Sequence, residues 1–138
     1  MSYHQSQLFN AWVVLRPAED VRGQWVAHCL DLDAVTQGDS PSHALNMAIE
    51  ASSMILLDDI ERGVNPVLRR APEQFWSDME NLLQQSTQIE ASQLHESVAS
   101  GRFGAFIVQM FLNVQKHTQS IPLLLAGPST ADALQQAH

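Results

Sequence analysis

One stretch, from Gln24 to Ser40, most constrains the fold of this 138-residue chain. The segment Gln24–Cys29 alternates between two sets of side chains with a period of two residues, which predicts a strand with two unlike faces. The two carboxylates of Leu30–Asp33 predict a bend, and the partly β-branched run Ala34–Gln37 predicts a second short strand. Two strands joined by so short a bend pair antiparallel.

Helix signals follow this stretch directly. Ser40 is a good N-cap because its hydroxyl can accept a hydrogen bond from an amide of the first turn, and Pro41 at the first helical position loses no useful donor. Gly38 supplies a permissive backbone at the exit from the strand, and Gly63 stands where a left-handed C-cap residue belongs. These four structural residues predict a helix from Pro41 to Arg62. Its apolar stripe has three- and four-residue spacing: Ala44, Leu45, Ala48, Ile49, Ser52, Ile55, Leu56 and Ile60.

A further strand precedes the stretch. The segment Leu8–Leu15 is largely apolar on both faces, which predicts a strand that is covered on one side and contacted on the other. Pro17 ends it because proline cannot donate to a ladder, and residues 18–23 form a loop of hairpin length. The three strands between Leu8 and Gln37 therefore make an antiparallel meander.

The second half of the chain predicts more helix and a fourth strand. An apolar stripe begins near Pro72, fades after Gln84 and resumes over Ile89–Val98, so that one helix and two helices both remain open. The segment Phe103–Val114 is rich in aromatic and β-branched residues, which favours a strand, although its length leaves a helical half open.

The predicted fold class is α+β: a three-stranded antiparallel meander, a long helix, a further helix or helices, and a fourth strand. We divide the chain into an α+β domain over residues 1–116, with a helical insertion at about 72–100, and a C-terminal tail over 117–138. Residues 130–138 are expected to form a weak terminal helix or to be disordered.

The charge balance bears on partners. The formal net charge is −8, from seven Lys and Arg against fifteen Asp and Glu. Nucleic-acid affinity comes mostly from Lys and Arg that neutralise phosphates, so the chain by itself is not expected to bind DNA or RNA. An acidic chain suits a basic partner; the alternative is that the charge only maintains solubility.

Location is predicted from what the sequence lacks. No apolar run reaches the ~20 residues that span a bilayer, so no membrane contact is expected. Residues 1–7 lack the basic region and apolar core of a secretory signal. Cys29 is the single cysteine, so no internal disulfide forms. We therefore expect a cytoplasmic protein.

Few residues suggest chemistry. His28 and Cys29 are adjacent on a strand and point to opposite faces, and no histidine pair has the spacing of a helical metal site, so no metal or cofactor is expected. Converging carboxylates among Asp31, Asp33 and Asp39 could hold a divalent cation, which leaves a metal-dependent nuclease acting through Asp31 and Asp33 as an alternative. Cys29 is interpreted as a small core residue. No catalytic residue is expected.

The run Trp25–Ser40, followed by Ala44-Leu45 and Ala48–Ala51, resembles the HicB-like antitoxin family. The likeness lies in a strand that ends in an acidic, leucine-containing bend, then a glycine, an acidic residue and a serine, then a helix of alanine and leucine. It covers about Leu8 to Arg62. It implies a partial ribonuclease-H-like fold, with a helix packed on a three-stranded meander and a fourth strand. Members typically neutralise a small RNA-cleaving toxin, HicA, and are not expected to share the catalytic carboxylates of ribonuclease H.

The resemblance implies a non-enzymatic antitoxin-type protein that binds and masks a basic HicA-like toxin or a related partner. Five residues of the run are candidates for partner binding: Trp25, His28, Asp31, Asp33 and Asp39. The chain departs from the family in the insertion at 72–100 and in lacking a basic recognition helix, so DNA binding is doubtful. The alternative is an orphan relative that self-associates as a dimer or larger homo-oligomer, since the aromatic segment 103–111 exceeds what one small sheet needs.

Overall fold

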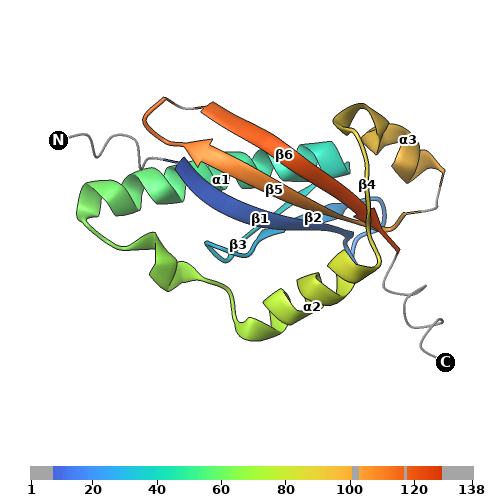
Figure 1. Cartoon of the computed structure of the whole chain (residues 1–138), viewed down its shortest axis with the longest axis horizontal. Coiled ribbons are helices and arrows are strands. Elements are labelled where there is room, and N and C mark those ends of the chain that lie inside the picture. The colour runs from blue at the N-terminus through green and yellow to red at the C-terminus, as the bar shows by residue number, and fades with distance from the viewer. Residues whose placement is uncertain (1–7, 101–102, 117, 129–138) are drawn as a thin grey trace.

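The computed structural model describes residues 8–100, 103–116 and 118–128 and has helices on both faces of one antiparallel sheet (Figure 1). The strands are β1 (Leu8–Pro17), β2 (Trp25–Cys29), β3 (Ala34–Gly38), β4 (Thr87–Gln88), β5 (Ala105–Asn113) and β6 (Thr118–Gly127). The helices are α1 (Pro41–Arg62), α2 (Glu73–Gln84) and α3 (Leu94–Ala99), with 3-10 turns η2 (Pro66–Arg69) and η3 (Ala91–Gln93). Within these residues the six strands are ordered β3-β2-β1-β5-β6-β4. The predicted α+β class is confirmed.

The elements expected between Leu8 and Arg62 are present. β1, β2 and β3 form the antiparallel meander, and α1 has the predicted bounds. β1 continues two residues beyond Leu15, because Arg16 and Pro17 lie opposite Val26 and Trp25 of β2. Pro17 is tolerated there as the last residue of the strand, where its missing N–H interrupts no further ladder.

Both ends of α1 are capped as predicted. The Ser40 hydroxyl accepts from the amide of His43 at 3.0 Å. Gly63 is left-handed, with φ of 70°, and its amide donates to the carbonyls of Asp59 and Ile60. Gly38 has a different role from the one expected. Its φ is not positive, but an added Cβ would lie 2.5 Å from the Ala44 nitrogen, so this position needs glycine because the start of α1 approaches it closely.

The apolar stripe of α1 is predicted correctly except near its end. Ala44, Leu45, Ala48, Ile49, Ser52 and Leu56 are buried, whereas Ile60 is 51% exposed. Asp59 takes the inward position, with a side chain that is fully buried. Arg69 of η2 holds both oxygens of that carboxylate, through Nε at 2.6 Å and Nη2 at 2.8 Å. A buried charge is tolerated when it is paired and hydrogen-bonded. Because Arg69 pairs with it, Asp59 is buried where the sequence predicted that Ile60 would be.

The region 72–100 contains two separate helices, α2 and α3, where the sequence pattern was compatible with one helix or with two. Between them, β4 pairs with β6 through Thr87–Ala126 and Gln88–Leu125. The predicted fourth strand corresponds to β5, and it lies beside β1. The strand that the aromatic and β-branched content of Phe103–Val114 favoured is therefore confirmed.

The prediction of a tail over 117–138 was wrong for its first part, since residues 118–127 form β6. The sequence pattern of this strand was obscured by Pro122, which lies within the apolar run 121–125. The register between β5 and β6 shifts at this point, because Gln109 lies opposite Leu123 and Phe111 opposite Ser120. This irregularity and the edge position of the exposed proline explain its tolerance within a strand. Residues 130–138, predicted as a weak helix or as disordered, lie outside the described residues.

Two apolar clusters lie on opposite faces of the sheet. Along β1, Ala11, Val13 and Leu15 belong to the cluster under α1 and α3, while Val14 belongs to the cluster under α2. The α1 cluster also buries inward-facing residues of β5: Phe106, Val108, Met110 and Leu112. The aromatic and aliphatic side chains of β5 that motivated self-association are therefore largely covered by this chain itself. No described helix is long and apolar enough to cross a membrane.

We predict that Gly38→Ala destabilises the protein by about 1–3 kcal/mol, since overpacking against main-chain atoms of α1 forces a local displacement. Urea denaturation followed by circular dichroism measures the change. The matched control is Gln37→Ala at the neighbouring exposed position. Equal stability of Gly38→Ala and the wild type would show that α1 does not approach β3 as closely as described.

We predict that Asp59→Asn lowers the urea midpoint clearly at neutral pH, because Arg69 then lacks its anionic partner. The hydrogen bonds from Arg69 lower the pKa of the Asp59 carboxyl. A carboxyl whose pKa is lower in the folded state stabilises it above the unfolded pKa and loses that effect as the pH falls through the folded pKa. The difference between wild type and Asp59→Asn therefore shrinks on acidification.

The matched control is Asp58→Asn on the same helix turn. Asp58 pairs with Arg62 at 3.3 Å, but both side chains are more than half exposed, and exposed ion pairs contribute little. If the two substitutions have equal effects at neutral pH, the Asp59–Arg69 pair has no special structural role.

Candidate partner-binding site

The structure brings two of the five candidate residues together. His28 lies on the α2 face of β2, and its Nε2 is 2.7 Å from Oδ1 of Asp33 in the bend before β3. Asp33 has a φ of 52°, a left-handed conformation that aspartate tolerates better than most residues. The His28 ring also packs against Phe75 of α2 in a T-shaped contact, with 4.9 Å between ring centroids. The imidazole is therefore held from two sides.

Asp31 belongs to a different contact. Its Oδ1 accepts a hydrogen bond from the main-chain amide of Trp12 at 2.6 Å. Burial raises the pKa of the Asp31 carboxyl, and the hydrogen bond from Trp12 opposes that effect in part. The adjacent Leu30 amide donates to the Trp12 carbonyl, so Asp31 continues the pairing of the bend with β1 beyond the end of β2. This carboxylate has a structural role.

Trp25 and Asp39 lie apart from this pair. Trp25 packs toward the α1 cluster, with its ring centroid 5.9 Å from that of Phe106, so the sheet separates it from His28. Asp39 is exposed beside the start of α1, where its carboxylate lies 3.0 Å from Nδ1 of His43. The five candidates therefore do not form one site. Strand alternation separates Trp25 from His28, and Asp31 and Asp39 are held by contacts with Trp12 and His43.

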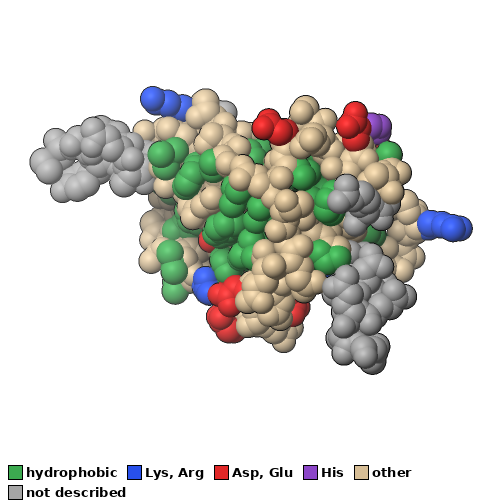
Figure 2. Space-filling view, turned by 45° about the vertical axis from the view of Figure 1, so that its right-hand side comes forward, with side chains coloured by type: hydrophobic (Ala, Val, Ile, Leu, Met, Phe, Trp, Pro, Cys, Tyr) green, Lys and Arg blue, Asp and Glu red, His purple; other side chains and the backbone are tan. Residues whose placement is uncertain are grey.

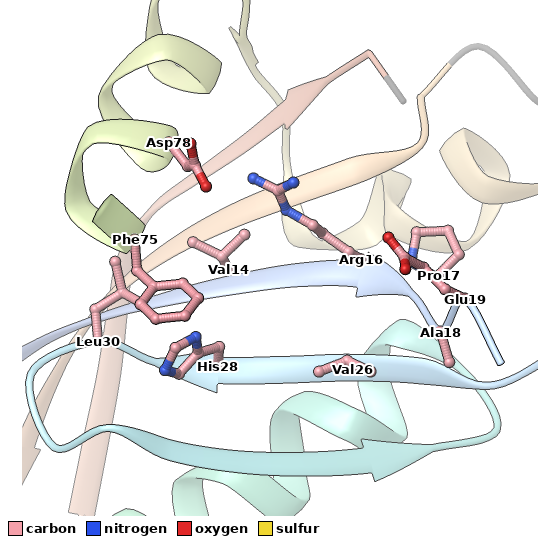
Figure 3. A pocket seen from close by; sticks show the side chains of 10 residues that line it. All are labelled: Val14, Arg16, Pro17, Ala18, Glu19, Val26, His28, Leu30, Phe75 and Asp78. Atoms are coloured by element: carbon pink, nitrogen blue, oxygen red, sulfur yellow. The ribbon is translucent and has the colours of Figure 1, made fainter. Parts of the chain in front are cut away.

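A cavity of about 270 Å³ lies beside His28, between α2 and the strands β1 and β2 (Figure 3). Apolar side chains supply most of its wall: Val14, Val26, Leu30 and Phe75, with Pro17 and Ala18 at one end. Its charged residues are Arg16, Glu19 and Asp78. Concave, mostly apolar sites with a few polar groups are the usual form of a binding site.

Sequence reasoning did not select Arg16, Glu19, Phe75 or Asp78 for this site. They come from β1, the loop after it and α2, and only the folded chain brings these segments together. A partial signal was present, since Phe75 and Asp78 are three residues apart on a predicted helix and therefore share a face. The β1–β2 register places Arg16 in the site, since Arg16 lies opposite Val26 and Val14 opposite His28.

Cys29 is a core residue, as predicted. Its side chain is fully buried in the α1 cluster, and burial raises the pKa of its thiol, which disfavours the reactive thiolate. Within residues 8–100, 103–116 and 118–128, no three side chains of His, Cys, Asp or Glu lie together as a metal-binding group.

Comparisons with protein-family models, with curated proteins and with solved structures gave no match to this chain.

We predict that Asp31→Ala costs about 1–3 kcal/mol of stability, because it leaves the Trp12 amide without its acceptor. Asp31→Asn keeps an acceptor oxygen and removes a desolvated charge, so it is expected to be at least as stable as the wild type at pH 7. A carboxyl whose pKa is raised in the folded state costs stability as the pH rises through that pKa. Any advantage of Asp31→Asn therefore disappears on acidification.

Urea denaturation of both variants at neutral and acidic pH measures these differences. Asp33→Asn is not a suitable control, since Asp33 holds His28; Asp20→Asn on the exposed loop after β1 serves instead. If Asp31→Ala and Asp31→Asn are equally stable at pH 7, the hydrogen bond to Trp12 is not the main contribution of this residue.

Proposed function

We propose that this chain is a non-enzymatic HicB-like protein that binds and masks a basic partner of the HicA-like toxin type. One observation carries the proposal: the run Trp25–Ser40 forms strand, acidic bend, strand and cap, and leads directly into α1 on the meander. The resemblance implies this series of elements, followed by a further strand. β5 occupies such a position, beside β1.

The charge distribution supports a basic partner. The chain carries a net charge of −8, and Figure 2 shows charged side chains at the margins of one face, around apolar side chains in its middle. Complementary charges raise the rate of encounter, whereas apolar contacts supply much of the affinity. Among the described residues, four large apolar side chains are at least 60% exposed: Leu8, Met54, Val67 and Leu68.

The nuclease alternative has less support. Asp31 binds the Trp12 amide and Asp33 binds His28, so each carboxylate is held by a different structural contact. Cleavage assisted by a divalent cation requires carboxylates that converge on one ion. The self-association alternative also has less support, since β5 is largely covered within the chain.

The test is co-expression of the tagged chain with the product of any small open reading frame that adjoins its gene. We expect the two proteins to co-purify at physiological ionic strength, and the chain to relieve the growth arrest that the partner causes when expressed alone. A basic protein of similar size, such as lysozyme, is the control for non-specific charge attraction. Light scattering of the chain alone reports whether it self-associates.

The proposal fails if the neighbouring product is neither retained nor neutralised. A homo-oligomer in light scattering together with no captured partner would favour the orphan, self-associating alternative. Cleavage of RNA or DNA by the purified chain in the presence of magnesium would favour the nuclease.

A further inference from the structure

The cavity beside His28 has a preformed apolar floor. On the α2 face, Val14 lies opposite His28 and Arg16 lies opposite Val26. The two valines therefore lie on one diagonal and the two polar residues on the other. Phe75 and Leu30 close one end, as Figure 3 shows. Because Asp33 and Phe75 hold the His28 ring, this end needs little rearrangement to receive a ligand.

The rim carries more negative than positive charge. Glu19 from the loop after β1 and Asp78 from α2 are both exposed carboxylates, whereas Arg16 is the one Lys or Arg among the lining residues. Two carboxylates and one guanidinium give the lining residues a formal charge of −1. The net charge of −8 adds to the attraction for a cation.

The shape and the charge together specify a guest with an apolar stem and a cationic head. Lysine and arginine side chains have this form, since their methylene groups cover apolar surface while the head stays among polar groups. Figure 3 shows Asp78 at the Phe75 end of the cavity and Glu19 at the opposite end, with the Arg16 side chain between them. A stem on Val14, Val26 and Phe75 would therefore bring the head toward Asp78.

We propose that this cavity receives a lysine or arginine side chain of the basic partner. The partner rests on the function proposed above, whereas the cavity's preference for a cationic side chain can be tested without it. The residues that would carry the contact are Asp78 for the charge and Val26 for the stem, while Glu19 adds negative charge at the other end of the cavity.

The first experiment uses blocked amino acids as probes: the N-acetyl, N-methylamide derivatives of arginine, lysine, norleucine and glutamate. Titration into the ¹⁵N-labelled chain is followed by amide chemical shifts. We expect arginine or lysine to shift the amides of Val26, His28 and Phe75, and norleucine and glutamate to bind more weakly. Equal binding of norleucine, preferential binding of glutamate, or no binding of any probe would overturn the proposal.

Paired substitutions locate the charge. Asp78→Asn is expected to weaken binding of the arginine probe about two- to fivefold, the factor that corresponds to an exposed ion pair, and Glu19→Gln at the other end of the cavity is expected to weaken it less. Their controls are Glu80→Gln on the opposite side of α2 and Asp20→Asn in the same loop, which lie outside the cavity. All four positions are exposed, so folding is expected to be retained. Equal effects of test and control variants would overturn the assignment.

A filling variant connects the cavity with the partner. Val26→Phe keeps a strand-forming residue, and its larger side chain fills the floor of the cavity. It is therefore expected to abolish probe binding and to lower the affinity for the partner at least tenfold. Partner binding that is unchanged by both Val26→Phe and Asp78→Asn overturns the inference and leaves the proposed function standing. Selective binding of the arginine probe without any captured partner has the opposite result: the cavity assignment stands and the proposed function fails.

Discussion

The structure depends on β1, a strand that must be buried on both faces. It pairs with β2 on one side and with β5 on the other, so it joins the N-terminal meander to the C-terminal strands. Ala11, Val13 and Leu15 require cover from one layer and Val14 from another. A single helix can cover only one face, and the chain therefore places α1 and α2 on opposite sides of the same strand (Figure 1).

The passage of the chain from one face to the other is organised around the buried pair of Asp59 and Arg69. Asp59 sits at the end of α1, and Arg69 is the last residue of η2, the turn that leads toward α2. Shortly after the pair, the Ala71 amide donates to the Leu30 carbonyl at 2.8 Å and ties this connection to the bend after β2. The start of α2, and with it Phe75, is thereby positioned over β2.

This arrangement accounts for the position of the cavity. α2 contacts β2 through Phe75 and His28, and reaches β6 at its other end, where Leu82 contacts Gly127. The helix thus crosses the sheet and leaves a cavity beside it, over Val14 and Val26, that the Arg16 side chain borders (Figure 3). The acidic bend, which holds His28 through Asp33, supports one wall of this opening. The run Trp25–Ser40 therefore has a structural role and also borders the candidate site.

Local sequence alone determined β1 to β3, the bounds and caps of α1 and the core position of Cys29, because each depends on periodicity or on capping chemistry within a few residues. For β5 it favoured a strand but left a helical half open. Tertiary structure decided the rest. The burial of Asp59 requires Arg69 ten residues later. β6 requires β5 and β4 as neighbours, and it accommodates Pro122 where its register with β5 shifts and β4 does not reach. The candidate site required β1, a loop and α2 to meet. Such contacts depend on the pairing of distant segments, and local patterns carry little information about that pairing.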